Sequence, residues 1–410
     1  MLDAVLRHIE AQRSEVVSLQ ENLVALLALG PDNGGDGEDA KCSFVRDYIR
    51  GLGLHEHIEM PSPDPRVNSG SRPNLAVRIQ GRSPRTLWVI SHLDVVPAGD
   101  LSLWTTDPWR LHVEDDILIG RGVEDNNQAV VSSLLAAKAL RELNVTPNLS
   151  YGMLFVADEE TGSKHGLDFV LREHGERFGK DDLFLIPDFG EPDGSLLELA
   201  EKSMFWLKIT VTGKQCHASV PHEGVNSLVA AAAFILKIRS LGECFDRVDP
   251  LFDPPRSTFE PTKKEANVEN VNTVPGRDVF YVDCRVLAEY PLTQVFDAIR
   301  DMGREIERAY GVSVEYHVVQ EEQAAPATSP DSDVARALSR AVFAETGKAP
   351  TPRGIGGGTV AAYLRRRGYE AAVWATLLHN AHQPGERARI SNHLNDAKVI
   401  ARMLLDDGQA

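Results

Sequence analysis

The stretch SYGMLFVADEETG, residues 150–162, carries the most information about the fold. Its first eight residues form an apolar run of strand length, and the next positions hold three adjacent carboxylates, those of Asp158, Glu159 and Glu160. Carboxylates held this close repel one another and raise each other's pKa. A fold tolerates them only where solvent, a cation or a chemical role compensates for the repulsion. The stretch therefore predicts a buried strand that ends at a functional edge.

Other apolar runs have the same form. TLWVI (86–90) is followed by SHLD, DLFLI (182–186) by PDFGEPDG, and AAVWATLL (371–378) by HNAHQPGE. Residues 126–143, between the first two strands, have helical periodicity, and the first 30 residues are expected to form an amphipathic helix. This alternation predicts an α/β domain with a mixed central sheet and flanking helices.

The middle of the chain has a different pattern. Its first predicted strand, 204–213, alternates more between apolar and polar residues, as a half-exposed strand does. The other predicted strands are 277–289 and 312–319, and the predicted helices are 225–241 and 292–310. This pattern predicts a smaller α+β domain inserted into the first. We place the first domain at residues 1–202 and 320–410, and the inserted domain at residues 203–319.

Composition excludes several classes of protein. A net charge of −17 argues against nucleic acid or an anionic membrane as a partner. The four cysteines form no CxxC pair, which argues against a thiolate zinc site or a disulfide framework. The charged N-terminus is unlike a signal peptide, and no apolar run reaches the roughly 18 residues of a membrane span. The sequence predicts a cytoplasmic protein.

Histidine and carboxylate residues follow all four predicted strands of the first domain: His92, Asp94, Glu159, Glu160, Asp188 and His382. In open α/β sheets, ligands bind just beyond the carboxyl ends of the strands. Imidazole nitrogen combined with carboxylate oxygen is the ligand set of zinc and related divalent ions. The pattern favours a metal site over ordinary solvated loops, which remain the alternative for any single residue.

Two of the carboxylates have a second interpretation. Asp94 faces the same way as His92 on an extended chain and could orient it, or could simply be an exposed residue at a strand end. Asp125 stands where the helix of residues 126–143 begins. It could complement the helix dipole or bind a metal ion, and the local sequence leaves both open.

Seven motifs occur in order along the chain: SHLDVVP, GRGVEDN, DEETGS, PDFGEP, GKQCHASVPHEGVNS, NTVPGRDVFYVDCR and HNAHQPGE. They resemble the motifs of the co-catalytic zinc peptidase and deacylase family. That family includes glutamate carboxypeptidase, aminoacylase, succinyl-diaminopimelate desuccinylase and acetylornithine deacetylase. The resemblance extends from about residue 15 to residue 400.

The resemblance implies two divalent metal ions per subunit, with Zn²⁺ favoured and Co²⁺ or Mn²⁺ as alternatives. Asp125 and a water molecule would bridge the ions. His92 and Asp188 would hold one ion, and Glu160 and His382 the other. Such a pair of ions lowers the pKa of the bridging water and polarises the scissile carbonyl.

The resemblance also implies roles for residues that bind no metal. Glu159 would be the general base that takes a proton from the bridging water and passes it to the leaving amine. Asp94 would count among the catalytic residues as the carboxylate that orients His92. The peptide bond between Asp125 and Asn126 would be cis, as it is in the family.

The inserted domain resembles the family's lid, which is also its dimerisation domain. His217 would reach into the partner subunit's site and stabilise the oxyanion, although it could be a structural histidine. Asn272 and Arg285 resemble the residues that bind the free carboxylate of the substrate, although an arginine on a strand is often a surface residue. A glycine-rich segment would form an anion nest with the same role, through Gly357, Gly358 and Thr359.

The implied activity is hydrolysis of an amide bond in a small substrate with a free carboxylate. Asp188 favours a dipeptidase or carboxypeptidase-like metallopeptidase, because family members that cleave peptides tend to have Asp there and the acyl-removing branches Glu. The alternative is an N-acyl-amino-acid amidohydrolase, either a deacetylase or a desuccinylase. A more distant alternative is a non-catalytic metal-binding protein of the same fold. The expected protein partner is a second copy of the chain.

Overall fold

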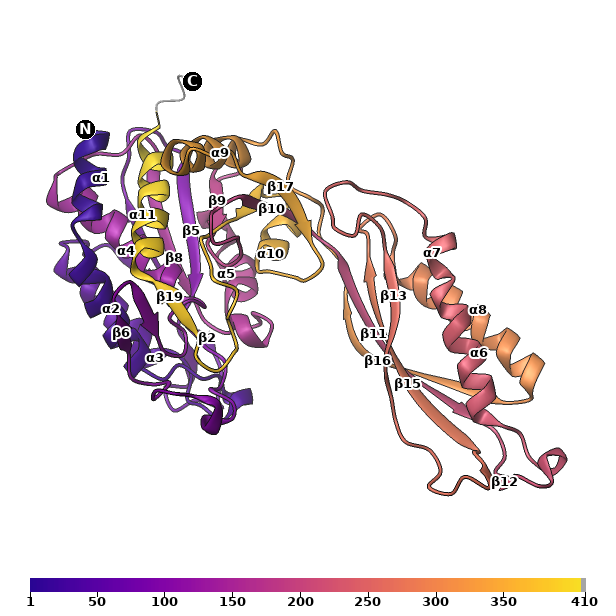
Figure 1. The fold of residues 1–410 in the computed structure, drawn as a ribbon. Helices are drawn as coiled ribbons and strands as arrows, with labels where there is room; N and C mark the ends of the chain where they lie inside the picture. The colour runs from indigo at the N-terminus through magenta and orange to yellow at the C-terminus, as the bar shows by residue number, and fades with distance from the viewer. Residues whose placement is uncertain (407–410) are drawn as a thin grey trace. The chain divides into compact units, whose positions relative to one another are not determined.

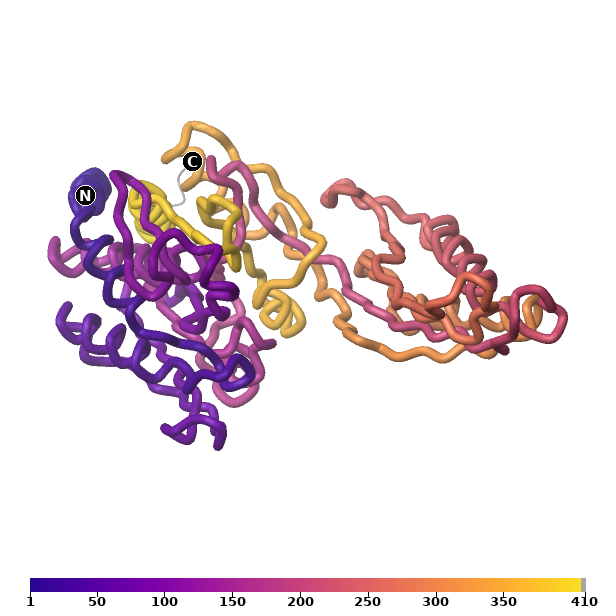
Figure 2. Tube along the Cα trace, turned by 60° about the horizontal axis from the view of Figure 1, so that its bottom comes forward, coloured from indigo at the N-terminus to yellow at the C-terminus, as the bar shows by residue number. Residues whose placement is uncertain are grey.

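A computed structural model of the protein describes residues 1–406, which form two compact units. The first unit contains residues 1–199, 328–352 and 363–406, and the second contains residues 200–327 and 353–362. Figure 2 shows that the indigo and yellow parts of the chain belong to the first unit, whereas the middle of the chain builds most of the second. The sequence had assigned the glycine-rich segment to the first domain.

Eight strands form the central sheet of the first unit: β1 (His57–Glu59), β4 (Leu75–Ile79), β5 (Thr86–His92), β8 (Ser150–Val156), β9 (Leu183–Ile186), β10 (Leu196–Glu201), β17 (Thr351–Ile355) and β18 (Ala371–Val373). Their order is β1-β4-β8-β5-β9-β18-β10-β17. The central strands β8, β5, β9 and β18 are parallel, while β4 runs antiparallel to β8 and β10 runs antiparallel to β18. The mixed central sheet of the prediction is therefore confirmed.

Helices cover the sheet on its two faces (Figure 1). They are α1 (Leu2–Glu10), α2 (Arg13–Ala25), α3 (Asp39–Gly51), α4 (Asn127–Glu142), α5 (Leu167–Glu173), α9 (Asp333–Thr346), α10 (Ala361–Arg366) and α11 (Ile390–Leu405). On one face, alternate strand residues such as Val89 and Met153 join one apolar core with α1, α2, α4, α9 and α11. On the other face, the ring of Trp88 packs edge-on against Phe178, with 5.1 Å between ring centroids.

Two predicted elements differ from the observed ones. The expected N-terminal helix is two helices, α1 and α2, separated at Ala11 and Gln12. The fourth predicted strand ends early, at Val373, and the chain beyond it leaves the ladder. Trp374 N still donates to the backbone oxygen of Ile186, the last residue of β9, at 3.1 Å, whereas Ala375 N donates to that of Phe189, beyond β9, at 3.0 Å.

The parallel strands bring the site residues to one edge. His92, the last residue of β5, is aligned with Val156, the last residue of β8. The chain after β9 leaves the sheet at the same edge, since Val89 pairs with Leu185. A small three-stranded sheet joins β6 (His112–Glu114) and β7 (Ile117–Ile119), which precede α4, to β19 (Arg387–Arg389), which precedes α11. A two-stranded ribbon joins β2 (Ser62–Pro63) and β3 (Ser71–Arg72).

The second unit has a four-stranded antiparallel sheet of order β13-β15-β11-β16. Its elements are β11 (Ser203–Thr212), β12 (Cys216–His217), α6 (Ser227–Arg239), α7 (Leu241–Cys244), β13 (Thr258–Lys264), β14 (Thr273–Val274), β15 (Arg277–Val286), α8 (Leu292–Tyr310) and β16 (Ser313–Glu322). Phe234 of α6 and Ile299 of α8 belong to the core of this unit, together with Phe280 of β15. Within residues 1–406, no helix is both long and apolar enough to cross a membrane.

Candidate metal centre

Asp125 stands between two histidines at the carboxyl edge of the central sheet. Its Oδ1 lies 2.9 Å from Nε2 of His92, and its Oδ2 lies 3.0 Å from Nε2 of His382. Burial by itself would raise the pKa of Asp125, but hydrogen bonds from both histidines hold it below its ordinary value. One carboxylate oxygen therefore faces each histidine, the arrangement that a bridging ligand needs.

Two further carboxylates complete the cluster. The oxygens of Glu160 lie 3.1 and 3.2 Å from Nε2 of His382, and Oδ1 of Asp188 lies 3.6 Å from Nε2 of His92. Potential ligand atoms of His92, Asp125 and Glu160 all lie within 4.8 Å of one another, as do those of His92, Glu159 and Asp188. The second group contains Glu159, which the sequence assigned to proton transfer and not to metal binding.

Asp94 connects the end of β5 to the acidic loop after β8. Its backbone oxygen lies 3.0 Å from Nδ1 of His92, and its Oδ1 lies 3.5 Å from the same nitrogen. Its two carboxylate oxygens accept the backbone N–H groups of Glu159 and Glu160, each at 3.0 Å. Asp94 thus orients the imidazole from behind, and it also fixes the two glutamates, which the sequence did not indicate.

Glu159 lies in the most strongly acidic part of the site. Burial raises the pKa of Glu159 well above its ordinary value, and the charge of Asp188 adds to the rise. In the described part of the chain, no Lys or Arg forms an ion pair with Asp125, Glu159, Glu160 or Asp188. Four crowded carboxylates with only two imidazoles beside them match the donor set and the charge of a site for divalent cations.

The peptide bond between Asp125 and Asn126 is cis, as the resemblance predicted. The side chain of Asn126 lies between Asp188 and the backbone of His92. Its Nδ2 donates to Oδ1 of Asp188 at 2.6 Å, and its Oδ1 accepts the backbone N–H of His92 at 3.3 Å. Asn126 therefore links residues from the ends of β5 and β9, a contact that no motif spacing revealed.

A buried ionic network that the sequence did not reveal supports the acidic loop. Arg72 is fully buried and forms an ion pair with Glu38, and its Nη1 lies 3.4 Å from Asp158 Oδ1. Asp158 also accepts the backbone N–H of His165 at 2.9 Å. Next to this network, Nζ of the buried Lys41 donates to Asn127 at 3.2 Å, and burial lowers the pKa of Lys41 to about 8. The sequence did not predict these ion pairs because their members lie 34 or more positions apart in the chain.

His217 lies in the second unit, on the ribbon of β12 and β14, and its side chain is exposed. Its Nδ1 accepts the backbone N–H of Ser219 at 3.1 Å. A neutral imidazole that accepts at Nδ1 carries its proton on Nε2. This nitrogen has no hydrogen-bond partner within residues 1–406, so it is a free donor.

The structure does not bring Asn272 and Arg285 together within one chain. Asn272 precedes β14, and its backbone oxygen accepts the N–H of Ala218, so it lies beside His217. Arg285 lies at the other end of β15, eight residues beyond Arg277, which is roughly 25 Å along a strand. Within one chain, Asn272 and Arg285 therefore do not lie close enough to contact one carboxylate, and their substrate-binding role stays a prediction.

Arg285 and the glycine-rich segment do lie together. Nη1 of Arg285 donates to the backbone oxygen of Gly356 at 2.6 Å, while its Nε and Nη2 donate to Asp283. The N–H and the hydroxyl of Thr359 both donate to Oε1 of Glu201, at 2.8 and 2.6 Å. The predicted anion nest would have to release this N–H before a carboxylate could bind there.

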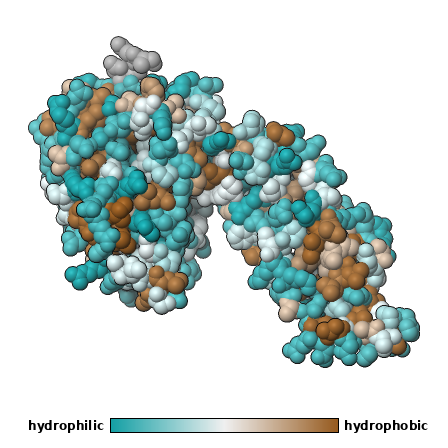
Figure 3. All heavy atoms as spheres, viewed as in Figure 1, coloured by the Kyte–Doolittle hydropathy of each residue, from teal (hydrophilic) through white to brown (hydrophobic). Residues whose placement is uncertain are grey.

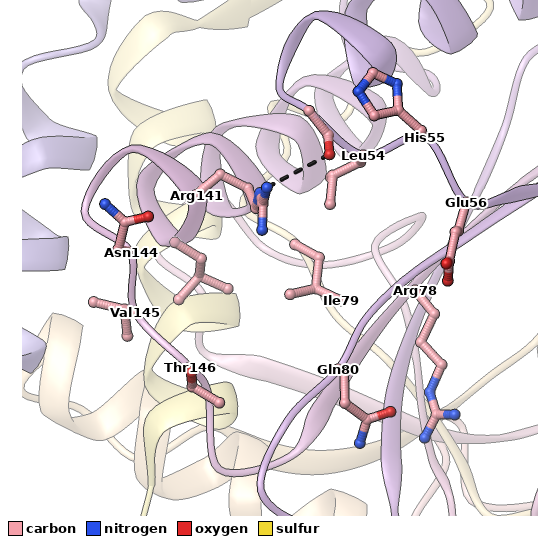
Figure 4. Close-up of a pocket in the computed structure, with 12 residues that line it drawn as sticks. Leu54, His55, Glu56, Arg78, Ile79, Gln80, Arg141, Asn144, Val145 and Thr146 are labelled. Carbon is pink, nitrogen blue, oxygen red and sulfur yellow. Dashed lines mark hydrogen bonds between the residues drawn. The ribbon is translucent and has the colours of Figure 1, made fainter.

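Two cavities of the first unit differ in their relation to the site. One, of about 620 Å³, borders the acidic loop and is lined by Asp158, Thr161 and His165, among others. The other, of about 510 Å³, lies beside Ile79, at the opposite end of the strands, because Ile79 pairs with Tyr151 at the start of β8. Figure 4 shows Arg141 within it, donating to a backbone oxygen, and none of the predicted site residues line it.

Comparison with known proteins agrees with this geometry. The sequence pattern of peptidase family M20/M25/M40 matches residues 88–406. An uncharacterized metallohydrolase of Methanococcus maripaludis is 37% identical over 95% of this chain and 98% of its own length. A succinyl-diaminopimelate desuccinylase of Polynucleobacter necessarius is 25% identical over 84% of this chain and 86% of its own length. The structure of an aminopeptidase from Bacillus cereus superposes with a TM-score of 0.75 at 17% identity, covering 96% of this chain and 98% of that one.

Proposed function

Since the chain belongs to peptidase family M20/M25/M40, it is a metallohydrolase of amide bonds, and we propose that its substrate is a small molecule with a free carboxylate, in the first place a dipeptide. The single observation that carries this proposal is the cluster around Asp125. Two imidazoles and four carboxylates meet there at the carboxyl ends of the parallel central strands, and no Lys or Arg forms an ion pair with these carboxylates in the described residues.

Five residues would hold the metal: His92, Asp125, Glu160, Asp188 and His382. Bound divalent ions, with zinc favoured, would polarise the scissile carbonyl and lower the pKa of a water molecule. Asp125 would be a ligand shared by the His92 and His382 sides of the site, because each of its carboxylate oxygens faces one imidazole. Asp94 would keep Nε2 of His92 directed at the site by accepting at Nδ1.

Glu159 would act as the general base. It is held in place through its backbone N–H by Asp94, and its carboxylate has no hydrogen-bond partner within residues 1–406. A free carboxylate with a raised pKa can accept the proton of the attacking water and deliver it to the leaving amine. The non-catalytic alternative is disfavoured because all six positions of the cluster are occupied by residues suited to these roles.

The second unit would complete the site from another copy of the chain. His217 and Asn272 lie at one end of its sheet and Arg285 at the other, so one subunit could not offer all three to one substrate. In a dimer, His217 and Asn272 of the partner could join Arg285 of the same chain. The free Nε2–H of His217 is the donor that a developing oxyanion requires.

An apolar surface supports this dimer. Leu228, Val229 and Leu236 of α6 are 40%, 51% and 70% exposed. Figure 3 shows hydrophobic side chains gathered on the visible face of the second unit. Because exposed apolar patches of this kind mark protein interfaces, we assign this face of α6 to contact with the second copy.

The experiment that tests the function is release of free amine from a panel of dipeptides, N-acetyl amino acids and N-succinyl amino acids. The metal-loaded protein is compared with a chelated sample. We expect dipeptide cleavage that is lost on chelation and restored by Zn²⁺ or Co²⁺. Cleavage confined to the N-acyl compounds would favour the amidohydrolase alternative, which the desuccinylase relatives also support. Cleavage that survives complete removal of metal would overturn the proposal.

A further inference from the structure

Two buried glutamates beside the metal centre have no role in the function proposed above. Glu124 is 1% exposed and Glu386 is fully buried. Glu124 directly precedes Asp125, and Glu386 follows His382 by four residues. Burying a carboxylate is costly unless hydrogen bonds compensate, so the contacts of these two side chains indicate what they do.

The carboxylate of Glu124 binds the segment that leads to His382. Its Oε2 accepts the backbone N–H of Leu378 at 2.6 Å, and its Oε1 accepts the N–H of Asn380 at 3.2 Å. The side-chain Nδ2 of Asn380 donates to Oε2 at 3.3 Å. Three donors from residues 378–380, in the segment that leads to His382, therefore bind one carboxylate in the segment that leads to Asp125.

The carboxylate of Glu386 makes the reverse connection. Its Oε1 accepts the backbone N–H groups of Glu124 and Asp125 at 3.0 and 3.1 Å, and its Oε2 accepts that of Gly122 at 3.1 Å. Arg121 forms an ion pair with the same carboxylate. The backbone of the bridging aspartate is thus held by a residue from the segment that carries His382.

The two segments also leave a common β-ladder. Ile119, the last residue of β7, pairs with Arg387, the first residue of β19, and Gly120 N donates to Glu386 O at 3.0 Å. Beyond this ladder, one segment continues to Asp125 and the other comes from His382. Their side chains meet again at the site, where the His382 and Asp125 atoms are 3.0 Å apart.

We propose that Glu124 and Glu386 are positioning residues that form a reciprocal carboxylate clamp, which sets the distance between Asp125 and His382 and so the affinity of the site for a divalent cation. This proposal rests on the metal-dependent function proposed above. Outer partners of metal ligands commonly change metal affinity by about 10- to 100-fold when they are removed. Neither residue touches the reacting atoms, so both act through the ligands they hold.

The test uses Co²⁺ as the probe, titrated into metal-free full-length protein and followed by its visible absorption. We expect Glu124→Gln and Glu386→Gln to weaken Co²⁺ binding about 10- to 100-fold and to change the shape of the absorption bands. Whichever oxygen the amide nitrogen replaces, at least one N–H loses its acceptor. Glu198→Gln is the matched control, because Glu198 is a fully buried carboxylate that pairs with Arg365 away from the site.

A double-variant cycle separates the clamp from a general effect on folding. In a His382→Ala background, Glu124→Gln should cause little further loss of Co²⁺ affinity, because the ligand through which it acts is gone. If Glu124→Gln does not fold, Asn380→Ala removes one donor to the same carboxylate at a half-buried position and should give a smaller shift of the same kind.

The outcomes distinguish the clamp from the function on which it rests. Absence of Co²⁺ binding by the wild-type protein would overturn the proposed metal site itself. Wild-type affinity and spectra in both Gln variants, with only the unfolding temperature lowered, would overturn the clamp alone. Equal loss of affinity in Glu198→Gln would also overturn it, since the effect would then follow from any buried carboxylate.

Discussion

Glu159 and Glu160 are neighbours in sequence, but their side chains have different contacts. Glu160 contacts Nε2 of His382, whereas the carboxylate of Glu159 has no hydrogen-bond partner in the part of the chain that the structure describes. Both backbones are held by Asp94. Adjacent side chains on a tight turn thus separate into one that contacts a ligand and one that remains available for proton transfer.

This difference predicts that a Glu→Gln substitution affects catalysis at position 159 and metal affinity at position 160. We expect Glu159→Gln to lower kcat about 10²- to 10⁴-fold with little change in Co²⁺ affinity, because the amide keeps the shape but accepts no proton. The matched variant Glu160→Gln should weaken Co²⁺ binding. Steady-state kinetics and metal titration measure the two effects. Hydrolysis at the wild-type rate by Glu159→Gln would show that another group is the base.

His393 predicts how stability depends on pH. It is fully buried in α11, its Nδ1 donates to the backbone oxygen of Arg389 at 2.7 Å, and burial lowers its pKa from 6.5 to about 4. Between these pH values the unfolded chain binds a proton that the native protein does not. The free energy of unfolding should therefore fall as pH drops through this window, by up to about 1.4 kcal/mol per pH unit from this residue.

The variant His393→Asn tests this sign. Its amide can keep the donor to Arg389 but does not titrate, so its stability should change less steeply between pH 6.5 and 4.5, as measured by urea unfolding. At pH 8 the histidine is neutral in both states, and the difference between the two proteins then reports packing alone. Parallel pH profiles for the two proteins would contradict the assignment.

At the scale of elements, α8 and β16 pack closely around a glycine. A Cβ added to Gly303 would lie 1.7 Å from the Tyr316 hydroxyl oxygen, but 3.1 Å from the ring carbon behind it. We expect Gly303→Ala to lower the free energy of unfolding by about 1–3 kcal/mol, because the ring must shift. The period of apolar residues in α8 predicted the helix at 292–310, but this contact depends on a strand that forms later in the chain.

The Tyr316→Phe background tests this explanation. Without the hydroxyl, the atoms nearest to the added methyl group are the ring carbon of residue 316 at 3.1 Å and that of Phe234 at 3.3 Å, so the rings need to shift only by a few tenths of an ångström. Alanine is favoured over glycine in a helix by up to about 1 kcal/mol, which offsets this shift. Gly303→Ala should then cost much less than in the wild-type background, as measured by thermal and urea unfolding of both pairs. Equal destabilisation in the two backgrounds would mean that the cost arises elsewhere, for example at Phe234, which lies 3.3 Å away.

At the scale of the whole molecule, the proposed dimer predicts complementation between inactive variants. His217→Ala keeps Glu159 but offers no imidazole to its partner, while Glu159→Gln offers His217 but lacks the base. After subunit exchange at equal concentrations, we expect about a quarter of wild-type activity, because half of the dimers are mixed and each has one complete site. Mixing without recovery of activity would show that His217 does not act across subunits.

Leu236→Glu tests the surface on which this depends. Leu236 is 70% exposed on α6, and a charge there should yield monomers in light scattering and prevent complementation. Leu101→Glu is the control, because Leu101 is 61% exposed but belongs to the first unit. If the wild-type protein is itself a monomer, the dimer proposal fails while the metal-site proposal stands.

The sequence by itself determined the mixed α/β fold, the membership of the family and the strands after which the site residues follow. These features are local: a period of apolar residues predicts an element, and a motif carries its residue types within a few positions. The same local information placed His92 and His382 in one predicted site, and the resemblance to the family added Asp125.

Only the tertiary structure decided how these residues are held. The reciprocal contacts of Glu124 and Glu386 join positions 262 residues apart, and the pair of Arg72 and Glu38 closes behind the acidic loop. The extended strand β15 separates Arg285 from Asn272, to which the resemblance had assigned the same role. Such contacts depend on strand pairing and on burial between segments that lie far apart in the chain. A local stretch of sequence does not predict them, because which groups come to lie beside a buried charge depends on the tertiary structure.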